Sequence, residues 1–119
     1  MGWVRLDLKD AITILRANDG SVLNLTFRFD YIGDEEAKEL ADVLATNNTL
    51  QRLKFSCTRI RGEGAKALAV ALATNNALQQ LGLGYNKIGP EGAKALAAAL
   101  GTNNTLKELD LGGNDIGEE

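Results

Sequence analysis

The sequence repeats itself with a period of 28 residues, and this repetition constrains the fold more than any other feature. The four residues Asn-Asn-Thr-Leu at 47–50 return twice further along the chain, with one exchange. When residues 47–74 are aligned with 75–102 without a gap, 16 of the 28 positions are identical. The same register runs back to about residue 19. A fixed period of this length is typical of a solenoid, in which similar units stack on one another.

Each unit combines a short alternating segment with a longer alanine-rich one. Leu81 and Leu83 alternate with small or polar residues, so the period-two geometry of a strand turns both leucines to the same face. Pro90 follows a glycine and suits the first turn of a helix, where its missing N–H would have had no partner. Further on, Leu96 and Leu100 recur four residues apart and belong to one apolar helical stripe. The unit therefore predicts a strand, a turn and a helix.

Stacked units of this kind predict an α/β fold, a right-handed βα solenoid with a parallel sheet on its concave face and helices on its convex face. Strands are expected near 23–27, 51–55, 79–83 and 107–111, and helices near 8–16, 35–45, 63–73 and 91–101. We expect residues 1–119 to form a single domain. Its expected parts are an N-terminal capping helix in 1–18, full repeats in 19–46, 47–74 and 75–102, and a partial repeat in 103–119.

The repeat resembles a known family. Residues 78–88 read Leu-x-x-Leu-x-Leu-x-x-Asn-x-Ile, and residues 89–96 read Gly-Pro-Glu-Gly-Ala-Lys-Ala-Leu. This pattern resembles the leucine-rich repeat. Its length and glycine-alanine motif resemble the ribonuclease-inhibitor-like subclass, which also supplies the repeats of NOD-like immune receptors and Ran GTPase-activating proteins. The resemblance implies a horseshoe segment that binds proteins.

One position of the repeat varies in a way that the resemblance makes informative. In this family, the asparagine after the strand typically satisfies buried backbone groups of the neighbouring turn. The chain has Asn86 and Asn114 there, but Asp30 and Thr58 in the first two units. An unpaired buried backbone group costs about 1–3 kcal/mol. We therefore expect looser turns in those two units.

The charge balance gives no general reason to bind nucleic acid or an anionic membrane, since 13 Lys and Arg stand against 16 Asp and Glu, a net charge of −3. The longest apolar stretch, residues 67–73, is far shorter than a membrane span, and the first residues lack the apolar core of a signal peptide. The single cysteine, Cys57, has no partner for an internal disulfide, and we expect its thiol to be inert. These features favour a cytoplasmic protein.

The chain lacks the usual parts of an enzyme. It has no histidine, which is the commonest general base and metal ligand, and Ser21 and Ser56 have no activating partner in the sequence pattern. Glu108 and Asp110 share a strand face, but two carboxylates without further ligands are more typical of a solvated surface. We therefore expect no catalytic activity, no cofactor and no metal.

The remaining candidate is the outer face of the predicted sheet, together with the rim at the C-terminal ends of its strands. Exposed arginine and tyrosine dominate binding hot spots, and three of the six aromatic residues fall in this set. The partner-binding candidates are Arg28, Phe29, Tyr31, Arg52, Lys54, Ser56, Arg59, Gln80, Tyr85, Lys87, Glu108 and Asp110. The same surface includes Asn24, Thr26, Cys57, Gly82, Gly84, Gly112, Gly113 and Asp115.

The charges on this face separate along the stack, with basic residues in the first units and acidic residues in the last. We therefore predict a non-enzymatic interaction module that binds a protein or peptide on its concave sheet. One alternative is a small-GTPase regulator of the Ran GTPase-activating type, which only the shared repeat supports. A second is a structural or engineered repeat fragment that associates with itself.

Self-association is expected at the C-terminal end, because the sequence stops within a repeat and the last strand would present an unpaired edge. The inward-facing residues expected to form this contact are Leu106, Leu109, Leu111 and Ile116. A homodimer is its simplest form.

Overall fold

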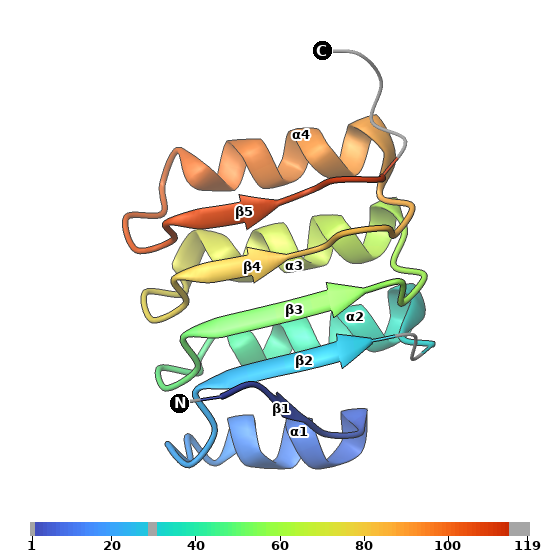
Figure 1. Cartoon of the computed structure of the whole chain (residues 1–119). Helices are drawn as coiled ribbons and strands as arrows, with labels where there is room; N and C mark the ends of the chain where they lie inside the picture. The colour runs from blue at the N-terminus through green and yellow to red at the C-terminus, as the bar shows by residue number, and fades with distance from the viewer. Residues whose placement is uncertain (1, 29–30, 115–119) are drawn as a thin grey trace.

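The computed structural model describes residues 2–28 and 31–114, and these form one layer of parallel strands backed by one layer of helices (Figure 1). The strands are β1 (Val4–Arg5), β2 (Asn24–Arg28), β3 (Arg52–Ser56), β4 (Gln80–Gly82) and β5 (Glu108–Asp110). The helices are α1 (Leu8–Arg16), α2 (Gly33–Leu44), α3 (Gly62–Thr74) and α4 (Gly89–Leu100). Strands and helices alternate along the chain, which confirms the α/β solenoid.

The sheet follows the 28-residue period residue by residue. Its order is β1-β2-β3-β4-β5, and every neighbouring pair is parallel. Leu53 of β3 pairs with Leu25 on one side and with Leu81 on the other, and Leu81 pairs with Leu109. Each partner is one period away. The strand positions expected from the repeat are therefore confirmed.

The alternating leucines and phenylalanines of the strands form the core between sheet and helices. Leu53, Leu81 and Leu83 are at most 2% exposed. Phe27 and Phe55, which occupy equivalent positions in β2 and β3, stack with ring centroids 5.4 Å apart and an interplanar angle of 10°. The same repeat position thus stacks on itself from unit to unit, which buries apolar area continuously along the solenoid.

Asparagines after the strands join each turn to the one before it. The Asn86 side chain accepts hydrogen bonds from the backbone N of Thr58 (2.9 Å) and Ile60 (3.2 Å), and its Nδ2 donates to the Phe55 carbonyl (3.1 Å). Asn114 repeats the contact one unit later by donating to the Leu83 carbonyl at 2.7 Å. Thr58 itself is fully buried and bonded to Asn86, while Asp30 lies outside the described residues.

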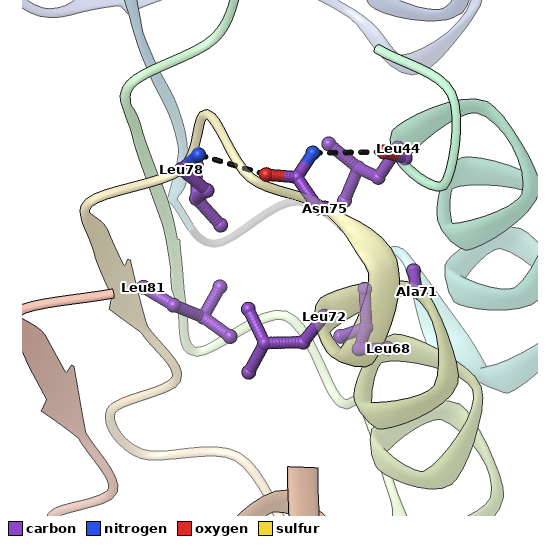
Figure 2. A pocket seen from close by; sticks show the side chains of 7 residues that line it. All are labelled: Leu44, Leu68, Ala71, Leu72, Asn75, Leu78 and Leu81. Atoms are coloured by element: carbon purple, nitrogen blue, oxygen red, sulfur yellow. Dashed lines mark hydrogen bonds between the residues drawn. The ribbon is translucent and has the colours of Figure 1, made fainter. Parts of the chain in front are cut away.

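A second series of asparagines also joins neighbouring units, at the opposite end of the strands. Asn75 donates from Nδ2 to the carbonyl of Leu44 at the end of α2 (2.8 Å), and its Oδ1 accepts from the backbone N of Leu78 (2.8 Å) (Figure 2). Asn47 and Asn103 occupy the same position in the neighbouring units and make the equivalent bonds. The sequence alone shows these asparagines as markers of the period and not as links between units.

The N-terminal segment contributes a strand as well as the expected helix. Val4 and Arg5 pair with Leu25 and Thr26, so β1 adds a fifth strand that the repeat did not predict. Helix α1 begins after Asp7, whose side chain accepts a hydrogen bond from the Asp10 backbone N at 2.8 Å.

Among the residues described, no helix is both long and apolar enough to cross a lipid bilayer.

Candidate binding surface

The helix-free face of the sheet, called the concave face below, carries the side chains that alternate with the core leucines. Strand pairing arranges them in rows across the sheet. One row runs from Asn24 through Arg52 and Gln80 to Glu108, and the next contains Thr26, Lys54, Gly82 and Asp110. Neighbours in a row are about 4.8 Å apart. The structure therefore brings most of the candidate strand residues together on one face.

Room for Lys54 comes from a glycine on the neighbouring strand. A Cβ placed on Gly82 would lie 3.2 Å from the Lys54 Cγ, so the base of the lysine side chain packs against β4 where any larger side chain would meet it. The repeat pattern placed Gly82 on this surface but did not connect it to the lysine. This contact positions the base of the cationic Lys54 side chain near the middle of the sheet.

Trp3 also lies on the concave face, which the repeat could not predict because Trp3 precedes the first unit. The Lys54 ammonium lies 4.8 Å from the centroid of the Trp3 ring, a cation–π distance. A hollow of about 550 Å³ opens beside this pair, and Arg28, Ser56 and Tyr85 also line it. An aromatic ring, two cations and a tyrosine thus share one concavity, called the concave hollow below.

The N-terminal segment lies beside two residues that were expected to be exposed, and the structure shows both to be buried. Asn24 and Thr26 occupy concave positions, but they are only 4% and 9% exposed. The Asn24 Nδ2 donates to the Gly2 carbonyl at 3.4 Å, and Trp3 lines the concave hollow together with Thr26. The accessible part of the concave face therefore begins at β3 and at the end of β2.

Candidate residues at the C-terminal ends of the strands are exposed. Tyr31 and Tyr85 are 70% and 71% exposed, and the Arg59 guanidinium lies 5.5 Å from the centroid of the Tyr31 ring. Lys87 is exposed on the next turn. The structure thus places Tyr31 and Arg59 together, and Tyr85 between the rim and the concave hollow. Phe29 and Asp115 lie outside the described residues.

Acidic residues occupy the far end of the concave face. Glu108 and Asp110 are exposed on β5, in the rows that contain Arg52 and Lys54. The Asp110 Oδ1 accepts a hydrogen bond from the Gly112 backbone N at 3.0 Å. Within residues 2–28 and 31–114, no three His, Cys, Asp or Glu side chains gather as a metal site would require.

The residues expected to mediate self-association lie on the core side of the sheet. Leu106, Leu109 and Leu111 pack against the core and are partly exposed. Ile116 lies outside the described residues. Strand β5 pairs with β4 on one side, and no strand of the described chain pairs with its other edge.

Comparison with known proteins matches the chain to a family model described as Leucine Rich repeat, over residues 46–69, 74–97 and 102–119. No curated protein matches the sequence. Two solved structures are similar in fold: actin-binding site 2 of leiomodin-1, with a TM-score of 0.82 and 24% identity, and the C-terminal domain of tropomodulin from Caenorhabditis elegans, with a TM-score of 0.78 and 17% identity. Each alignment covers 92% of this chain. The chain spans 64% of the leiomodin-1 structure and 66% of the tropomodulin structure.

Proposed function

Because the chain belongs to the leucine-rich repeat family, we propose that it is a non-enzymatic interaction module that binds a protein or peptide on its concave face. The basic and aromatic half of that face, formed by Trp3, Arg28, Arg52, Lys54 and Tyr85, contacts the partner. The partner contributes an acidic stretch of chain. The acidic residues of β5 orient it, because they repel the same stretch.

The observation that carries this proposal is the concave hollow. Arginine, tyrosine and tryptophan are enriched among residues that dominate binding energy, because they bury large areas and retain a polar group. Here Trp3 is 39% exposed and Tyr85 is 71% exposed, so both have area left to bury against a partner. Lys54 lies between them in the same hollow, where partial enclosure strengthens its attraction to an anion.

We also propose a repeat subclass, a cellular setting and a first partner to assay. The 28-residue period and the full helix in each central unit support the ribonuclease-inhibitor-like subclass. The single cysteine supports a cytoplasmic setting. The leiomodin-1 structure is named for an actin-binding site, which supports a protein partner in general terms and makes actin one of the first proteins to assay.

A charge-reversal experiment tests the concave face. Peptides are selected from a random phage-displayed library on the wild-type chain, and their affinities are then measured on Arg52→Glu/Lys54→Glu. The matched control is Lys66→Glu/Lys94→Glu, which makes the same charge change on exposed positions of α3 and α4. Trp3 is the only tryptophan, so its fluorescence reports binding at the concave hollow directly.

We expect selected peptides to be acidic, to change Trp3 fluorescence, and to lose roughly tenfold or more in affinity on the concave variant while the control changes little. Raising the salt concentration should lower the affinity of the peptides for the wild-type chain. Peptides that bind the concave variant as tightly as the wild type, or that weaken equally on the control, would place the binding surface elsewhere.

A further inference from the structure

A second hollow lies at the C-terminal ends of β3 and β4, next to the concave hollow. Its volume is about 440 Å³, and the residues that line it are Cys57, Arg59, Arg61, Tyr85, Asn86 and Lys87. We call it the rim pocket. Cys57 and Tyr85 line both hollows, so a chain lying in the concave hollow reaches the rim pocket directly.

The rim pocket gathers positive charge. Arg59, Arg61 and Lys87 are all exposed, and no Asp or Glu of residues 2–28 and 31–114 lines the pocket. The two arginines also form the wall of a neighbouring hollow that contains acidic residues. Of these, Asp34 already accepts hydrogen bonds from the backbone N of Arg61 and Gly64, at 2.8 and 3.0 Å. An anion is therefore attracted to the rim pocket and not to the neighbouring hollow on the other side of the two arginines.

The backbone around the rim pocket is held in an unusual conformation. Four residues other than glycine have positive φ in the part of the chain that the structure describes, and Cys57 (58°), Arg59 (67°) and Tyr85 (59°) are three of them. Residues in this region cost free energy and cluster at ligand sites. Equivalent turns place the positive φ on Gly33 and Gly89, where no such cost arises.

Asn86 holds this turn in place. Its Oδ1 accepts from the backbone N of Thr58 and of Ile60, the two residues that flank Arg59. The Arg59 guanidinium also rests over the Tyr31 ring. The base of the Arg59 side chain is thus positioned before a ligand arrives, which reduces the entropy lost on binding. Its guanidinium lies against Tyr31, a residue of the neighbouring hollow, and turns toward the rim pocket when a ligand binds.

We propose that the rim pocket binds the phosphate of a phosphorylated side chain in the partner peptide, an inference that rests on the proposed function of the concave face. A phosphate monoester carries close to two negative charges at neutral pH and three acceptor oxygens. Two arginine forks and one ammonium match this charge and these oxygens better than they match a single carboxylate. The adjoining concave hollow holds the acidic chain on either side of the phosphorylated residue.

The test uses the full chain and three fluorescein-labelled pools of degenerate nonapeptides, with a central phosphoserine, phosphotyrosine or unmodified serine. Fluorescence anisotropy measures affinity for the wild type and for Arg59→Asn/Arg61→Gln, since asparagine tolerates positive φ. The matched control is Lys66→Gln/Lys94→Gln on the helices. Cys57, the only cysteine, provides a site-specific readout, because an occupied pocket should slow its alkylation by iodoacetamide.

We expect at least one phosphorylated pool to bind about tenfold more tightly than the unmodified pool, to protect Cys57, and to lose that preference on Arg59→Asn/Arg61→Gln but not on the control. Inorganic phosphate alone should protect Cys57 at millimolar concentration and compete with the phosphorylated pool. A circular dichroism melt like that of the wild type shows that the variant is folded.

Three results would overturn the proposal. Equal affinity for phosphorylated and unmodified pools would show that the pocket does not recognise phosphate, and the proposed function would survive if the concave variant still lost binding. Equal loss on the helix control would show a general charge effect. Tighter binding of a single-stranded oligonucleotide through the same arginines would assign the phosphate to nucleic acid instead.

Discussion

Asn86 joins two units of the solenoid through Thr58, which donates hydrogen bonds from both its backbone N and its Oγ1 to the Asn86 Oδ1, each at 2.9 Å. Thr58 is completely buried and Asn86 is 3% exposed. The threonine therefore does not replace the asparagine of the other units. Thr58 is instead a donor to the asparagine of the following unit. Asn86 therefore holds the turn that contains Thr58.

Replacing Asn86 with alanine should lower the free energy of unfolding by about 3 kcal/mol or more, because several buried polar groups of Thr58, Ile60 and Phe55 lose their partner and each costs about 1–3 kcal/mol. Urea denaturation measures the change. The exposed Asn76 is the control, and Asn76→Ala should change stability by less than about 0.5 kcal/mol. Similar values for the two variants would contradict the bridging role of Asn86.

Leu81→Ala should cost about 2–5 kcal/mol, as truncations in protein cores do. Leu81 is 2% exposed and faces Leu72 and Leu68 around a small cavity of roughly 10 Å³ (Figure 2). Chemical denaturation checks the value, with Val70→Ala as the control because Val70 is 73% exposed on α3. A loss below about 1 kcal/mol for Leu81→Ala would mean that the inward face of β4 is misassigned.

Gly64→Ala should destabilise the chain by about 1–3 kcal/mol, because the added methyl group overpacks a contact between units. Its Cβ would lie 2.7 Å from the Asp34 Oδ1 and 2.9 Å from the Ile60 Cγ2. The same Asp34 oxygen accepts hydrogen bonds from the backbone N of Arg61 and Gly64 at the start of α3, so these bonds would be strained as well. Thermal melts compare it with Gly20→Ala, where a Cβ meets nothing within 4 Å. Equal melting temperatures for both variants would argue against this contact.

The period alone was sufficient to predict the strands β2 to β5, the helices α2 to α4 and the inward leucines, because each position is repeated and its periodicity is unambiguous. The two-residue strand β1 was missed, because Val4 and Arg5 lie outside the repeat and are too few to show alternation. The structural role of Asn47, Asn75 and Asn103 was missed for a different reason. Their partners are carbonyls in the helix one unit further back, which no local pattern identifies.

The candidate surface was predicted less completely than the fold. Alternation identified which strand residues face outward, such as Arg52 and Lys54. It could not show that Trp3 lies beside Lys54, since that contact spans two units and depends on β1. The rim pocket depends on the positive φ of Arg59, in a turn that has Arg61 where the neighbouring units have Gly33 and Gly89. The sequence shows the exchange of glycine for arginine, but not the backbone that results.

Self-association through β5 remains a prediction that light scattering can decide. Leu109 on β5 and Leu111 just after it are partly exposed, and the outer edge of β5 has no partner in the described chain; exposed apolar edges favour pairing. At tens of micromolar we expect a mass of twice 12.7 kDa, which Leu111→Glu should return to one chain. A mass of 12.7 kDa at every concentration would exclude the dimer. The exposed Lys107→Glu is the control for charge on the same unit.

The backward reach of the asparagines determines how the length of such a chain can change. Asn75 and Asn103 each bond to a carbonyl in the unit that precedes them, 31 residues earlier in the sequence. Adding or deleting one whole unit between these bonds gives every asparagine an equivalent partner, so the hydrogen bonds survive. The first unit shows that one extra residue can be accommodated in a turn, because Asn47 bonds to the Leu15 carbonyl 32 residues earlier. Duplication or excision of complete 28-residue units is therefore the change of length that keeps these hydrogen bonds without rearranging a turn.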